Sequence, residues 1–163
     1  MVADLSYGFS LPATPKTVFE MLTNPDFLTK KIELAQSGEY RTSGSAPDVT
    51  IEVTRTVTAD LPSMVRKFVG EKLIVKETQN WKQLSADLYQ ADFGLKIPNA
   101  PVDISGQITV SGTNQSDVSI TAKVKVNVPI FGASAEPHVV DTIKKVLLDE
   151  QSLCREWITA NNN

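Results

Sequence analysis

The chain has 163 residues, 41% of them hydrophobic and 21% charged, and its formal net charge is −3. This length and composition predict one soluble globular domain that spans residues 1–163. The negative net charge argues against nucleic acid as a partner, and no apolar stretch approaches the roughly 20 residues of a membrane-spanning helix, so integral membrane association is not expected.

A strand and two short helices are predicted first. Apolar residues alternate with small or polar ones between Leu5 and Leu11, which is typical of a strand with one apolar face. Thr14-Pro15 and Asn24-Pro25 each place a capping side chain before a proline, which fits the first position of a helix. Each pair therefore predicts a helix start, and the second helix is expected to bury Leu34 with its other apolar residues.

Six further strands are predicted in the middle of the chain. They cover residues 38–42, 49–57, 73–82, 86–93, 102–110 and 118–128. The short connections between them favour antiparallel pairing. A tight turn is expected near Gln83-Leu84 and a hairpin turn at 112–116, whereas the segment 61–70 fits one or two helical turns.

The last quarter of the chain predicts one long helix. At Pro129–Gly132 the apolar period changes from 2 to 3.6, and the helical pattern continues from Ser134 to about Ala160. Such a helix spans roughly 40 Å, which is enough to cross the concave face of a curved sheet. The predicted fold class is therefore α+β, with a curved antiparallel sheet of about seven strands wrapped around the C-terminal helix.

One face of this helix is expected to be mostly buried and the opposite face exposed. The inner face holds Val139, Val140, Ile143, Val146, Leu147, Leu153, Cys154 and Trp157. The outer face holds Lys144, Lys145, Asp149 and Arg155. Basic pairs such as Lys30-Lys31 are likewise expected on solvated faces. The single Cys154 cannot form an internal disulfide, and no apolar signal core follows the N-terminus, which together indicate a cytoplasmic protein.

Two charged residues fall on the apolar faces of strands. Arg55 is at an even offset from Val53, so it is expected to point toward the apolar side of the sheet. A buried guanidinium is costly unless it is paired. Arg55 therefore holds an anionic ligand group, pairs with an internal carboxylate, or reaches solvent at the strand end. Glu77 shares a strand face with Trp81 and is the natural partner of Arg55, as a polar spot in a cavity or a structural ion pair, unless a bulge turns it outward.

If the sheet and the long helix enclose a cavity, six residues are expected to bind its ligand. They are Arg55, Glu77, Trp81, Val140, Ile143 and Leu147. An enzyme with the same architecture would use Glu77, Asp92 or Tyr89 as an acid or base in that cavity.

The remaining candidate residues fit structural roles. Trp81 and Trp157 are expected in the core, where aromatic side chains contribute most. His138 is the sole histidine and is expected to be exposed, and Cys154 is expected to be a buried thiol. The sequence contains no GxSxG, HExxH or glycine-rich phosphate loop. No catalytic residue, metal or cofactor is therefore assigned.

The order of elements resembles the START-like superfamily, also called helix-grip or SRPBCC, which includes polyketide cyclases, plant pollen-allergen-like proteins and lipid-transfer domains. The segments 61–70, Glu77–Trp81 and Val128–Gly132 look like those of a mainly actinobacterial family of unknown function. The resemblance implies one START-like domain that binds a small hydrophobic or amphiphilic molecule. Two alternatives stay open, namely a cyclase or hydratase acting in the same cavity and a protein with a filled core that works through its surface.

Overall fold

The computed structural model describes residues 2–58, 63, 66–67, 70, 72–98, 100–127 and 132–161. Its elements in chain order are β1 (Ala3–Leu11), α1 (Pro15–Leu22), α2 (Pro25–Glu33), β2 (Ser37–Ser45), β3 (Asp48–Thr58), β4 (Lys72–Ser85), β5 (Leu88–Lys96), β6 (Val102–Gly112), β7 (Ser116–Val126) and α4 (Gly132–Asn161). The α+β class, the seven strands, the two short helices after the first strand and the long C-terminal helix are all confirmed.

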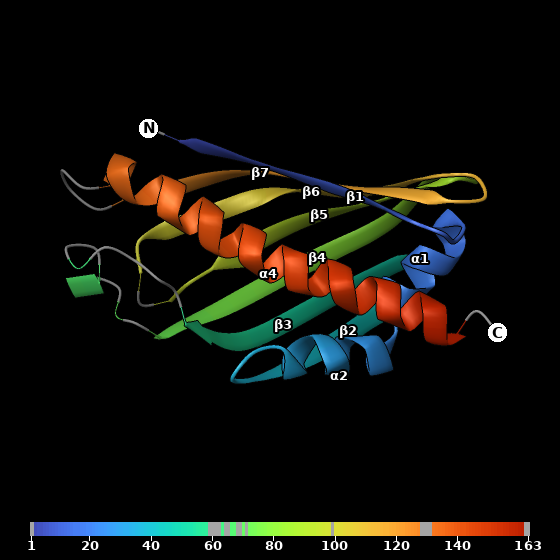
Figure 1. Cartoon of the computed structure of the whole chain (residues 1–163), viewed down its shortest axis with the longest axis horizontal. Coiled ribbons are helices and arrows are strands. Elements are labelled where there is room, and N and C mark those ends of the chain that lie inside the picture. Colours follow the sequence, from blue (N-terminus) through green and yellow to red (C-terminus); the bar gives the residue numbers. More distant parts are fainter. Residues whose placement is uncertain are drawn as a thin grey trace.

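The seven strands form one antiparallel sheet with the order β1-β7-β6-β5-β4-β3-β2. Strands β2 to β7 each pair with their neighbour in sequence, and β1 closes the order by pairing with β7. The sheet curves, and α4 lies across its concave side (Figure 1). Because side chains alternate along each strand, the apolar residues of the sheet face α4 and the polar ones face outward.

The two short helices begin where their caps predict. The Thr14 hydroxyl accepts a hydrogen bond from the backbone N–H of Thr17 at 3.3 Å, and the Asn24 side chain accepts one from Asp26 at 2.8 Å. The expectation for Leu34 is wrong, because α2 ends at Glu33 and Leu34 is 49% exposed where the chain turns toward β2.

The turn between β4 and β5 falls later than the sequence predicts. β4 continues to Ser85, and the chain reverses at residues 86–87 instead of at Gln83-Leu84. A register shift between Gln83 and Ser85 accompanies this extension and leaves Leu84 exposed. Most of the segment 61–70, and the turn at residues 129–131, lie outside the described residues.

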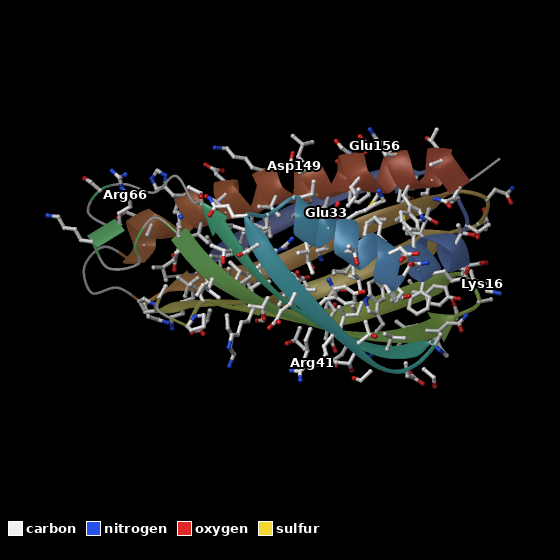
Figure 2. All side chains as sticks on the ribbon, turned by 90° about the horizontal axis from the view of Figure 1, so that it is seen from below. Lys16, Glu33, Arg41, Arg66, Asp149 and Glu156 are labelled. Carbon is white, nitrogen blue, oxygen red and sulfur yellow. The ribbon has the colours of Figure 1, made fainter. Side chains whose placement is uncertain are left out.

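Helix α4 divides into an inner and an outer face as expected. Val139, Val140, Leu153 and Cys154 are buried, whereas Ile143, Val146, Leu147 and Trp157 are half-buried. Lys144, Lys145, Asp149 and Arg155 are exposed on the other side, as expected. Figure 2 shows Asp149 on the side of α4 that faces away from the sheet, with Arg41 on the opposite side of the molecule.

Aromatic side chains fill the core around α1. Phe19 stacks on Tyr89 with ring centroids 4.5 Å apart, and its edge contacts Trp81 at 5.6 Å. Val18 of the same helix has no exposed surface, and Leu28 of α2 is 1% exposed. This packing fills one end of the space between the sheet and α4, near α1.

Candidate ligand cavity between the sheet and the C-terminal helix

A cavity of about 130 Å³ lies between the concave face of the sheet and α4. Every strand except β2 contributes to its wall, together with α1, α2 and α4. Most of the wall is apolar and includes Val57, Leu95, Ile97, Val126, Ile143 and Leu147. Apolar cavities of roughly 150 Å³ hold a molecule the size of benzene, so the space fits a ring-sized group.

The burial of α4 varies along its length in a way that follows the cavity. Val139 near its start and Cys154 near its end are buried, whereas Ile143, Val146 and Leu147 between them are only half-buried. All five side chains line the cavity. The middle of the helix therefore lacks full packing because its inner face borders the cavity.

Four charged side chains from four different elements meet at this cavity. They are Lys31 of α2, Arg55 of β3, Glu77 of β4 and Glu150 of α4. We call this set the charged cluster. The exposed fraction of each side chain is between 6% and 16%, so the cluster lies largely out of solvent.

Each cation of the charged cluster contacts both carboxylates. An Arg55 guanidinium nitrogen lies 2.8 Å from Glu150 Oε1, and the other terminal nitrogen lies 3.3 Å from Glu77 Oε1. Lys31 Nζ lies 3.3 Å from Glu77 Oε1 and 3.8 Å from Glu150 Oε1. The register of the sheet explains the contact between Arg55 and Glu77, because Val53 is opposite Glu77 and Arg55 is therefore its diagonal neighbour on the same face.

A hydrogen-bonded chain extends the cluster along β4. Gln79 donates its amide N–H to Glu77 Oε2, and its carbonyl accepts the indole N–H of Trp81 at 2.9 Å. These three residues alternate along one strand and all line the cavity. Trp81 thus joins the charged cluster to the aromatic packing around α1.

The charged cluster determines the protonation of Glu77 and Arg55. Burial alone would raise the pKa of Glu77, but Lys31 and Arg55 outweigh it and lower that pKa to about 2. Burial would also lower the pKa of Arg55, yet Glu150 and Glu77 raise it above its ordinary value. Both groups are therefore charged at neutral pH, although neither is exposed to solvent.

Cys154 lines the same cavity, and its thiol is unreactive at neutral pH. Burial, with a smaller contribution from Glu150, raises the pKa of its thiol to about 12. The thiolate is the reactive form of cysteine. Cys154 is therefore a small apolar part of the wall, as the sequence predicts, and has no nucleophilic character at neutral pH.

The structure brings five of the six expected ligand residues to one cavity. Arg55, Glu77, Trp81, Ile143 and Leu147 line it, and their binding of a ligand stays a prediction. Val140 is buried but does not line the cavity, whereas its neighbour Val139 does. Successive helical residues are about 100° apart around the helix axis. Val139, Ile143 and Leu147 therefore form one stripe along the helix, and Val140 lies to one side of it.

The six expected ligand residues do not include Lys31 and Glu150, which the structure places in the charged cluster. The interpretation of Lys30-Lys31 as a solvated pair is wrong for Lys31, which is 5% exposed. Lys31 follows Phe27 by one helical turn, and this spacing was the available signal. Glu150 follows Ile143 and Leu147 on the inner face of α4, so the helical period already placed it there.

Of the three residues considered as an acid or base, Glu77 lines the cavity and Asp92 and Tyr89 do not. Asp92 is exposed on the outer face of β5, where it accepts a hydrogen bond from Gln107 at 3.1 Å, so its expected place in the cavity is wrong. Tyr89 is buried against Phe19 and is not part of the wall.

The other candidate residues lie away from the cavity. His138 is exposed, as expected. Trp157 packs its ring edge-to-face against Phe27 with centroids 5.7 Å apart, outside the cavity wall. Within the described ranges, no group of three His, Cys, Asp or Glu residues is arranged to hold a metal ion. None of the helices in that part of the chain is long and apolar enough to cross a membrane.

Comparison with known proteins identifies relatives of unknown function and a shared fold. The model of a family described as "Protein of unknown function (DUF2505)" matches residues 6–158. An uncharacterized protein of Mycobacterium tuberculosis (strain ATCC 25618 / H37Rv) is 23% identical over 127 residues, which are 76% of this chain and 72% of that protein.

Two solved structures illustrate the fold. The crystal structure of TTHA0849 from Thermus thermophilus matches with a TM-score of 0.70 at 16% identity, over 99% of this chain and 100% of the other. A START superfamily protein from Mycobacterium smegmatis matches with a TM-score of 0.59 at 9% identity, over 95% of this chain and 98% of the other. The fold is therefore START-like.

Proposed function

The chain belongs to the DUF2505 family of proteins of unknown function, and we propose that it binds one small hydrophobic or amphiphilic molecule between the sheet and α4. The observation that carries the proposal is the apolar cavity beneath the half-buried middle of that helix. Natural interiors are close-packed, so a space of this size along a continuous apolar wall is uncommon unless something fills it.

The composition of the wall supports a small-molecule ligand. Ligand sites combine a mainly apolar lining with a few convergent polar groups. The charged cluster supplies such groups at one place, and Ile143 and Leu147 of α4 supply apolar surface across from the strands. A hydrocarbon body against the apolar wall with a polar end at the cluster would satisfy both parts.

The protonation of the charged cluster favours binding over acid–base catalysis. A general acid or base works best with a pKa near the working pH. Glu77 instead has a pKa of about 2 and already accepts hydrogen bonds from Lys31, Arg55 and Gln79. Its oxygens are engaged, and it remains ionised at neutral pH.

A fluorescent apolar dye tests the proposal with a matched pair of tryptophan variants. N-phenyl-1-naphthylamine is uncharged, and its emission rises when it enters an apolar site. Leu147→Trp fills part of the cavity, whereas Leu148→Trp adds the same ring at a side chain that is 55% exposed. We expect Leu147→Trp to weaken dye binding by about tenfold or more, which corresponds to about 1.4 kcal/mol, because its ring occupies part of the cavity. Leu148→Trp should leave dye binding unchanged, because its ring lies on the exposed side of α4.

Circular dichroism and thermal unfolding establish that both variants are folded before the dye is added. Native mass spectrometry of the purified wild-type protein then asks whether a small molecule accompanies it. The proposal is wrong if the wild-type protein binds neither the dye nor benzene, which matches the size of the cavity, or if both tryptophan variants bind the dye as well as the wild-type protein does.

A further inference from the structure

The formal charges of the charged cluster cancel. Two cations, Lys31 and Arg55, face two carboxylates, Glu77 and Glu150, and every contact distance lies between 2.8 and 3.8 Å. No surplus charge therefore faces the cavity from these four groups. This balance differs from a site for an ion, which presents an excess of opposite charge.

The cluster nevertheless retains hydrogen-bonding capacity. A guanidinium carries five N–H groups and an ammonium carries three. The side-chain hydrogen bonds of Arg55 use one terminal nitrogen toward each carboxylate, and Lys31 donates to Glu77. In the described part of the chain, every buried side-chain nitrogen or oxygen already has at least one partner, but each terminal guanidinium nitrogen and the ammonium nitrogen carry more than one N–H. Additional N–H groups of the two cations can therefore donate to an incoming oxygen without breaking the existing ion pairs.

We propose that the ligand group that reaches the charged cluster is uncharged and bears an oxygen, such as a hydroxyl, carbonyl or amide. This inference rests on the proposed binding function and names the class of molecule. An ionised carboxylate would approach Arg55 only beside Glu77 and Glu150, and an ammonium would approach those carboxylates only beside the two cations. Either ion would lose its water without gaining an unmatched counter-charge, which is unfavourable in an apolar cavity.

Glu150 is the member of the cluster that sets this preference most directly. Of the two carboxylates it is the one that α4 contributes, and its side chain is 16% exposed, compared with 7% for Glu77. Replacing it by glutamine keeps its size while leaving Lys31 and Arg55 with one carboxylate. The cavity would then face one surplus positive charge, and a carboxylate ligand should become acceptable.

Three eight-carbon probes of nearly equal size test the inference: 1-octanol, octanoate and octylamine. The affinity of each probe is measured by its competition with N-phenyl-1-naphthylamine for the wild-type protein and for three variants, Glu150→Gln, Lys31→Met and Asp149→Asn. Asp149 is the neighbouring carboxylate on the outer side of α4 (Figure 2), so Asp149→Asn changes the same charge away from the cavity.

We expect 1-octanol to bind the wild-type protein at least about tenfold more tightly than either ion, the scale of a single charged contact. Glu150→Gln should improve octanoate binding by about tenfold, Lys31→Met should improve octylamine binding, and Asp149→Asn should change neither. The order of the three probes on the wild-type protein decides the inference even if one variant does not fold.

The possible failures are distinguishable. If the dye binds but octanoate or octylamine outcompetes 1-octanol on the wild-type protein, the ligand class is wrong and the binding function stands. If Glu150→Gln and Asp149→Asn affect octanoate equally, the cluster does not select the ligand. If the protein binds neither the dye, benzene nor any probe, both the inference and the proposed function fail.

Discussion

Two regions of the space between the sheet and α4 differ in how their side chains fill it. Around α1, Val18, Phe19 and Leu28 are almost completely buried, and aromatic rings stack at close range. Under the middle of α4, Ile143 and Leu147 are half-buried and border a cavity. There the charged cluster links α2 and α4 to the sheet and to each other, in addition to apolar contacts such as that of Phe27 with Trp157. We call these the filled region and the cavity region.

The largest effect is expected from removing a leucine in the filled region. Leu28→Ala deletes a side chain that is 1% exposed, and such truncations typically cost about 2–5 kcal/mol because the surroundings collapse only partly. Urea unfolding of the purified variant measures the loss of unfolding free energy. A loss below about 1 kcal/mol would show that this region is not packed as described.

The second prediction concerns the stability of the protein in acid, which depends on the charged cluster of the cavity region. The pKa of Glu77 is lowered to about 2 in the folded protein from an ordinary 4.5, so its stabilising contribution is present above pH 4.5 and is lost as the pH falls toward 2. At about 1.4 kcal/mol for each pKa unit, we expect a loss of about 3 kcal/mol over that range.

Urea unfolding at several pH values measures this loss, and Glu77→Gln is the matched variant. The variant should be less stable than the wild-type protein at pH 7, because Lys31 and Arg55 lose a buried counter-charge. Its stability should fall less between pH 4.5 and 2, whereas Asp149→Asn should retain most of the wild-type acid sensitivity. Equal acid sensitivity in the wild-type protein and Glu77→Gln would show that protonation of Glu77 does not cause the loss of stability in acid.

The smallest effect is expected from removing a leucine in the cavity region. Leu147→Ala deletes the same atoms as Leu28→Ala, but these atoms already border the cavity, so the loss should be about 1 kcal/mol or less. Leu148→Ala on the exposed side of α4 serves as the reference for helix propensity alone. A cost for Leu147→Ala equal to that for Leu28→Ala would mean that no difference in packing separates the two regions.

Much of this architecture could be predicted because local patterns specify it. Period-2 alternation assigned Arg55 and Glu77 to the inner faces of adjacent strands, and antiparallel pairing then made them neighbours. The proline and capping pairs fixed the starts of both short helices. The 3.6-residue period of α4 placed Leu147 on the inner face and Asp149 on the outer one.

The rest depends on features that local patterns do not contain. The spacing of Lys31 after Phe27 indicates only that Lys31 lies on the inner side of α2, whereas its pairing with Glu77 follows from the position of α2 against β4. The apolar face of α4 includes Val140 and therefore predicts it in the cavity wall, but the cavity borders only one stripe of that face. The extension of β4 to Ser85 results from a register shift in its pairing with β5. The cavity itself results from sheet curvature, which alternation of apolar residues leaves undetermined.

A crystal structure of the protein under xenon pressure tests the contrast between the filled and cavity regions most directly, because xenon enters apolar cavities large enough to hold it. We expect xenon to bind between the sheet and the middle of α4, in contact with Ile143 and Leu147, and not between Phe19 and Tyr89. Xenon confined to the surface groove beside Lys30 and Trp157, or absent from the interior at high pressure, would contradict the account.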